Sequence, residues 1–172
     1  MKASWRTLIA LFAPGIFFGG GLLALAARGG EWSWLGSFAR WPWELWLIAV
    51  AGSLATIAGC GDWMWHRWAR GCVVSRGERR CEFVAVAGGG GTLFALMTAA
   101  SLSARPQVWL LPAVIVVIAT TALICYDEFV FHRKRCGGVE TLLHRVLVFG
   151  QGTAWLAWAH WCFVQGGIRA LA

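Results

Sequence analysis

Four pairs of ionisable residues could do chemistry in this sequence, because the members of each pair lie four positions apart. Residues at that spacing share one face of a helix. Carboxylates together with imidazoles are ligands that suit iron, manganese or zinc. The spacing therefore predicts four helix faces that present metal ligands, and the predicted ligands are Asp62, His66, Glu78, Glu82, Glu128, His132, Glu140 and His144.

Positive charge must lie among these residues if they meet, since carboxylates brought together repel one another. The nearby arginines or metal ions can supply that charge. Four helices that each contribute an acid, some of them adding a histidine, follow the logic of di-iron carboxylate bundles. We therefore predict two transition-metal ions, with iron favoured and manganese or zinc as alternatives. Asp127, Arg67 and Arg133 would orient the ligands from behind.

This ligand inventory resembles that of the ferritin-like di-iron proteins, in which glutamates and histidines project from four helices. That class uses the spacing Glu-x-x-His, whereas this chain has Glu-x-x-x-His at Glu128 and again at Glu140. The resemblance is therefore one of chemistry and implies no family. An alternative interpretation treats the same acids and arginines as salt-bridged, solvated ends of membrane helices.

The elements that carry these residues are predicted to be membrane helices. Of the 172 residues, 59% are hydrophobic, which exceeds the roughly 45–50% of a soluble domain. A bilayer core about 30 Å thick requires about 20 apolar residues in each helix, and a helix pairs every backbone group within its own segment. Five runs meet that length, over residues 5–27, 43–65, 81–102, 108–131 and 139–164.

An internal repeat organises these runs. Two sets of residues recur in order: Cys60, Asp62, His66, Arg67 and Cys72 as Cys125, Asp127, His132, Arg133 and Cys136, and Glu78, Glu82, Gly88 and Gly90 as Glu140, His144, Gly150 and Gly152. We predict an all-α integral membrane protein with a single transmembrane domain over residues 1–172, made of a lone helix (5–27), repeat A (43–102) and repeat B (108–164). The two repeated hairpins would form a four-helix bundle about an axis along the membrane normal, and the glycines at 88–91, 150 and 152 would let its helices approach closely.

The placement of lysine and arginine predicts the orientation, since cytoplasmic loops carry the excess of positive charge. The N-terminus and the segments 66–80 and 132–145 hold most of the 15 basic residues. We therefore expect a multi-pass protein of the cell inner (cytoplasmic) membrane, with the N-terminus in the cytoplasm and the C-terminus outside. The net charge of +7 then favours lipid headgroups as partners and not nucleic acid. The tryptophan-rich loop 28–45 is expected to lie at the outer membrane surface as an anchor.

Two further features stand apart from the predicted ligands. His160 follows His144 by sixteen residues, too far along a helix axis to share its site, and we expect it to be hydrogen-bonded within the bundle or to headgroups. The six cysteines include no Cys-x-x-Cys pair, so the sequence lacks the motif of disulfide-exchange enzymes.

The predicted function follows from the predicted ligands. We expect a membrane-embedded di-metal carboxylate–histidine protein that acts as an oxidoreductase or oxygenase on a lipophilic substrate at the cytoplasmic membrane edge, since non-haem iron with open positions activates oxygen. Two alternatives stay open. The protein is a non-enzymatic small subunit or assembly partner of a larger membrane complex or homo-oligomer, with the charged layer as its docking surface, or it is a metal-handling membrane protein.

Overall fold

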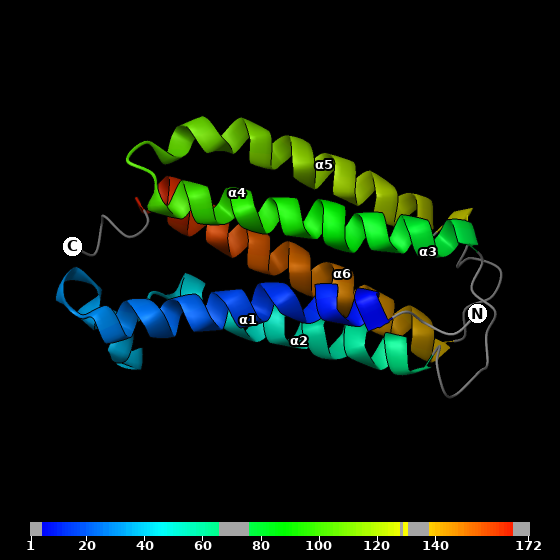
Figure 1. The fold of residues 1–172 in the computed structure, drawn as a ribbon, viewed down its shortest axis with the longest axis horizontal. Helices are drawn as coiled ribbons and strands as arrows, with labels where there is room; N and C mark the ends of the chain where they lie inside the picture. The colour runs from blue at the N-terminus through cyan, green and yellow to red at the C-terminus, as the bar shows by residue number, and fades with distance from the viewer. Residues whose placement is uncertain (1–4, 66–75, 128, 131–137, 167–172) are drawn as a thin grey trace.

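The structure is a computed structural model that describes residues 5–65, 76–127, 129–130 and 138–166. Within those residues 93% are helical and none lies in a strand. The long helices run side by side in an elongated bundle (Figure 1). Their bounds are α1 Trp5–Arg28, α2 Trp43–Met64, α3 Arg76–Phe83, α4 Gly91–Leu102, α5 Leu110–Asp127 and α6 Gly138–Ala159. The π-helical segments η4 Val84–Gly90 and η7 His160–Val164 join α3 to α4 and extend α6, and the short 3-10 segments are η1 Gly30–Gly36, η2 Phe38–Arg40 and η5 Pro106–Trp109.

Four segments of the described chain are long and apolar enough to cross a membrane, namely Leu8–Arg28, Trp43–Met64, Val84–Leu102 and Pro106–Asp127. The fifth predicted run is helical as α6 and η7 but is not among these four, and its first turns hold Glu140, His144 and Arg145. The third helix begins at Arg76 rather than at the predicted Cys81, because the charged turn before the apolar run is helical as well.

The most extensive helix contact is between α2 and α6, which run antiparallel. A Cβ placed on Gly150 would lie 2.9 Å from the Ala51 carbonyl oxygen and 2.9 Å from the Ala55 Cβ, so the two backbones touch at this level. Nearer the other end of the pair, a Cβ on Gly61 would lie 3.3 Å from the Leu143 side chain. Small residues at these positions let the helices approach, as the sequence predicted for Gly150.

Helix α5 packs on the other half of the bundle, against α3, η4 and α4. A Cβ placed on Gly89 would overlap the Thr120 side chain. The repeat alignment places Thr120 where the first copy has Ala55, so this contact corresponds to the one between Ala55 and Gly150. The alignment pairs Gly150 with Gly88, whereas Gly89, one residue later, makes the contact. This shift of one residue falls within η4, because a π-helical turn holds one residue more than an α-helical turn. Each repeat thus packs its first helix on the second helix of the other, the exchange of partners that a two-fold axis along the bundle would produce.

The other predicted contact glycines do not meet a neighbouring helix. A Cβ on Gly91 or Gly152 would meet nothing within 4 Å, and Cβ atoms on Gly88 and Gly90 would meet only their own segment η4. The prediction of close approach is therefore correct at one glycine of each repeat and wrong at the rest of the group. All of these residues are glycine, so the sequence alone does not tell which of them lies on the helix face that makes the contact.

Helix α1, which has no counterpart in the repeat, lies along α2 and η4. Near its start the rings of Trp5 and Trp63 have centroids 4.8 Å apart. One turn and a half further on, the Leu11 side chain fills the space over Gly59, where a Cβ would lie 2.9 Å from both of its methyl carbons. Helix α1 also carries exposed apolar side chains such as Ile9 and Leu23, which suits contact with lipid.

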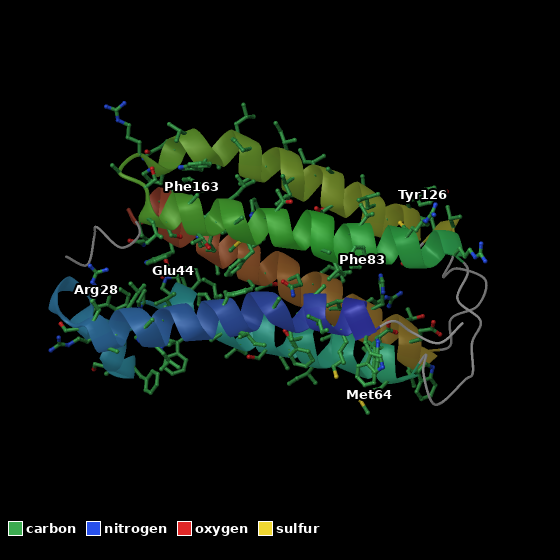
Figure 2. The ribbon with its side chains drawn as sticks, in the orientation of Figure 1. Arg28, Glu44, Met64, Phe83, Tyr126 and Phe163 are labelled. Atoms are coloured by element: carbon green, nitrogen blue, oxygen red, sulfur yellow. The ribbon has the colours of Figure 1, made fainter. Side chains whose placement is uncertain are left out.

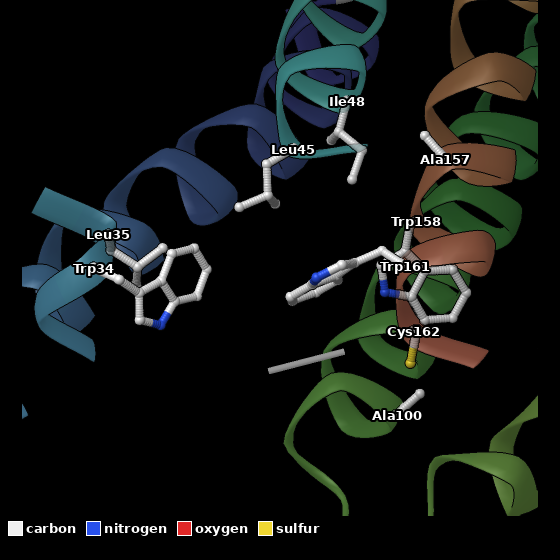
Figure 3. Close-up of a cluster of buried hydrophobic side chains, with 9 residues drawn as sticks. All are labelled: Trp34, Leu35, Leu45, Ile48, Ala100, Ala157, Trp158, Trp161 and Cys162. Carbon is white, nitrogen blue, oxygen red and sulfur yellow. The ribbon is translucent and has the colours of Figure 1, made fainter. Parts of the chain in front are cut away.

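At one end of the bundle, an apolar cluster rich in tryptophan joins η1, α2, α4 and α6 with η7. Its buried members are Trp34, Leu35, Leu45, Ile48, Ala100, Ala157, Trp158, Trp161 and Cys162 (Figure 3). We call this end the tryptophan end. The loop expected to lie at the membrane surface also contributes to this cluster, since Trp34 is 8% and Leu35 is 5% exposed. Phe38 on the same loop stays exposed.

Candidate metal centre and a second polar pair

The predicted metal ligands that the structure describes lie at the end of the bundle opposite the tryptophan end. Asp62 is in the last turn of α2, Asp127 ends α5, and Glu140 and His144 are in the first two turns of α6. Figure 2 labels Met64 and Tyr126 near this end and Glu44 and Phe163 near the other. We call it the charged end, defined by Asp62, Asp127, Glu140 and His144.

The positions of several predicted site residues lie outside the part of the chain that the structure describes. His66, Arg67, Glu128, His132 and Arg133 lie outside the described residues. Glu78 and Glu82 are placed on α3 by their backbone, while their side chains lie outside the described part of the structure. Five of the eight predicted ligands therefore have no described side chain.

The register of α2 against α6 brings two of the predicted ligands, Asp62 and His144, to about the same level of the bundle. Because Gly61 faces Leu143 in this antiparallel pair, Asp62 lies at about the level of residues 142–144 of α6. Glu140, one turn nearer the end of the bundle, is only 4% exposed. The Oδ1 atom of Asp62 and the Nε2 atom of His144 are also buried. Asp62, Glu140 and His144 thus lie in neighbouring turns of the α2–α6 pair at the charged end, but their side chains do not come together as one group.

The pair of α5 with α3 concentrates acidic residues in the corresponding place. Asp127 is 6% exposed at the end of α5. The Cys81 thiol donates a hydrogen bond to the Leu123 carbonyl oxygen at 3.6 Å, which ties α3 to α5. Cys81 precedes the apolar span that begins at Val84, and burial raises the pKa of its thiol, with the negative charge of Asp127 raising it further. The backbone of α3 therefore brings Glu78 and Glu82 to the same end as Asp127.

No three His, Cys, Asp or Glu side chains come together as a group that could hold a metal ion within residues 5–65, 76–127, 129–130 and 138–166. The remaining predicted ligands, whose side chains the structure does not describe, are His66, Glu78, Glu82, Glu128 and His132. The expectation that Asp127 supports the ligands while Glu128 binds metal also stays a prediction, because Asp127 is described and Glu128 is not. The structure adds that Asp127 is buried.

A second polar pair lies at the tryptophan end, and only one of its members, His160, was recognisable from the sequence. The Nδ1 atom of His160 lies 2.8 Å from the Oε1 atom of Glu44. Glu44 is 1% exposed, whereas the His160 side chain is 39% exposed. The expectation that His160 is hydrogen-bonded within the bundle is thus confirmed. Glu44 was missed because it follows a tryptophan-rich loop, and only the pairing of α2 with α6 reveals it as the partner of His160.

Comparisons of the chain with protein-family models, with curated proteins and with solved structures find no match. The internal repeat still offers a comparison within the chain. By that comparison Asp62 and Asp127 occupy equivalent ends of α2 and α5, and each is placed against the first turns of a helix that carries a further pair of ionisable residues.

Proposed function

We propose that this protein is a multi-pass protein of the cytoplasmic membrane whose charged end faces the cytoplasm and binds two transition-metal ions, with iron favoured. It would act there as an oxidoreductase or oxygenase on a lipophilic substrate. The observation that carries the proposal is the burial of Asp127 and Glu140, which are 6% and 4% exposed at the ends of two different helices.

Burial of these acids requires compensation by positive charge. Taking an ionised carboxylate out of water costs several kcal/mol even after relaxation, and acids inside membrane proteins almost always face a partner or a functional path. Basic side chains and metal ions can supply this positive charge. The imidazole of His144, with a buried Nε2 atom, favours a metal, because imidazole and carboxylate together form a transition-metal ligand set.

The helix pairing divides the predicted ligands of the two metal ions into two sets. The α2–α6 pair supplies Asp62, Glu140 and His144, and His66 would follow on the continuation of α2. The α5–α3 pair supplies Asp127, and the sequence adds Glu78, Glu82, Glu128 and His132. The two sets are related by the repeat but are not identical, since Glu82 stands where the other copy has His144. The proposed sites would therefore differ in charge and in affinity.

Bound ions would supply Lewis-acid or one-electron chemistry. The chain's own contribution is to hold and orient. Asp62 and Glu140 would bind metal from adjacent helices, and His144 would ligate through Nε2. Asp127 would orient the ligands that the α5–α3 pair supplies. The packing of α1 over α2 and η4 shields the helices from one side, so a lipophilic substrate would approach between helices from the membrane.

Metal content tests the proposal. The full-length protein purified in lipid nanodiscs should contain two equivalents of a transition metal by elemental analysis. The substitutions Glu140→Gln and His144→Ala should each remove about one equivalent, because they act on one of the two helix pairs. Glu44→Gln changes an equally buried acid at the tryptophan end and should leave the metal content unchanged. Less than one equivalent in the unmodified protein would refute the proposal.

A further inference from the structure

The pair of Glu44 and His160 has the geometry of an imidazole held by a carboxylate. Glu44 lies in the first turn of α2, and His160 begins the π-helical segment η7. With Glu44 as a carboxylate, which only accepts hydrogen bonds, the Nδ1 atom of His160 must be the donor at 2.8 Å. The Nε2 atom of the neutral ring is then an acceptor. Glu44 thus fixes both the tautomer and the direction of the ring.

The His160 side chain is partly accessible. The His160 side chain is 39% exposed while its partner is 1% exposed, so the ring lies between the core and the surface. The Trp43 ring lies beside it, with centroids 5.3 Å apart and an angle of 44° between the planes, and Trp43 is itself 55% exposed. A single turn of π-helix such as η7 often marks a functional position.

The same end of the bundle also holds hydrogen-bond donors with no acceptor. The indole N–H groups of Trp34, Trp109 and Trp155 are buried and make no hydrogen bond within the described residues. Trp34 is 8% exposed and belongs to the buried apolar cluster, and the other two tryptophans pack against that cluster. Buried donors are nearly always satisfied in folded proteins, by the chain, by water or by a ligand. The tryptophan end therefore combines a partly exposed imidazole with three buried indole N–H groups that make no hydrogen bond within the described residues.

We propose that the tryptophan end binds a lipophilic quinol, with a phenolic hydroxyl donating to the Nε2 atom of His160. Aromatic walls suit a flat ring, which packs in offset or edge-to-face contact with indoles. An oxygen of the quinol would accept from an indole N–H of the cluster. The buried carboxylate of Glu44 disfavours anionic ligands such as phosphate headgroups. This inference uses the membrane placement proposed above but not the metal ions of the charged end.

The first test compares two probes on the unmodified protein in lipid nanodiscs, with binding followed by tryptophan fluorescence and corrected for partition into empty nanodiscs. The probes are a decyl-substituted hydroquinone, kept reduced, and its dimethyl ether. The ether keeps the ring and both oxygens but donates no hydrogen bond, so it should bind at least about tenfold more weakly, which corresponds to about 1.4 kcal/mol. Equal binding of the two probes would overturn the proposal.

Variants then assign the contact. His160→Phe keeps an aromatic ring but removes both nitrogens, so the hydroquinone should bind about tenfold more weakly and the preference over the ether should vanish. Glu44→Gln should weaken binding less, because an amide can still hold the ring. Thr153→Val, at an exposed position of the same helix, should bind as the unmodified protein does.

If His160→Phe binds the hydroquinone as tightly as the unmodified protein does, the phenolic hydroxyl does not donate to His160. That result would refute the site. Metal content measured on the same preparations separates the two proposals. A protein that holds two equivalents of metal and does not discriminate between the probes would refute the quinol site and leave the proposed metal function standing.

Discussion

Replacing Gly150 by alanine should separate α2 from α6, and the structure gives the size of the effect. The added Cβ would lie 2.9 Å from the Ala51 carbonyl oxygen and 2.9 Å from the Ala55 Cβ. Both are closer than van der Waals contact, and one of them is backbone, which no rotamer change relieves. Overpacking of this kind costs about 1–3 kcal/mol. Against it stands the gain of about 1 kcal/mol from replacing glycine by alanine inside a helix.

The matched control is Gly152→Ala, two residues further along the same helix, where a Cβ would meet nothing within 4 Å. This control keeps the helix-propensity gain and lacks the collision, so the two variants should differ by about 1–3 kcal/mol. Reversible unfolding in mixed micelles, followed by circular dichroism, measures that difference. Gly150→Ala should also lower metal content, because it moves Asp62 relative to Glu140. Equal stability of the two variants would refute the pairing of α2 with α6.

Two further predictions concern the contacts of α5 with α3 and η4. Gly89→Ala should destabilise the protein by about 1–3 kcal/mol, since its Cβ would overlap Thr120, and the double variant with Thr120→Ala should recover most of that loss in a double-mutant cycle. Cys81 should be alkylated slowly at pH 8, because burial and the charge of Asp127 raise the pKa of its thiol and the thiolate is the reactive form. Asp127→Asn should move the alkylation profile to lower pH.

A different result would contradict each of these two predictions. Additive effects of Gly89→Ala and Thr120→Ala would show that the two side chains do not meet. An alkylation profile of Cys81 that is the same with and without the Asp127 carboxylate would show that the charge lies too far away to act. The exposed thiol of Cys125, on α5, serves as the reference for reagent reactivity.

The helices were predictable from the sequence because long apolar runs favour helices that could cross a membrane. The partners were not, since hydropathy does not say which helix lies beside which. The repeat allowed α2 and α5 to be recognised as equivalent, yet Gly150 and Gly152 look alike in the sequence and only Gly150 makes contact. The π-helical segment η4 left no recognisable signal either, and it shifts the second contact by one residue to Gly89.

The candidate residues were predictable to different degrees. Spacing of four placed Glu140 and His144 on one helix face, and the structure confirms that both begin α6. The partnership of Glu44 with His160 was hidden, because the two residues are 116 positions apart and Glu44 has no counterpart in the repeat. Tryptophan near charged residues is typical of a membrane interface, but this pattern does not tell that Trp34 also packs into the buried cluster.

The central claim is that the charged end binds metal, and anomalous X-ray diffraction at the metal absorption edge tests it most directly. Crystals of the full-length protein grown in a lipid phase would be measured above and below the iron edge. We expect two anomalous peaks at the end of the bundle where Asp62, Asp127 and Glu140 lie. Crystals of protein purified without chelator that show no peak at this end would contradict the account.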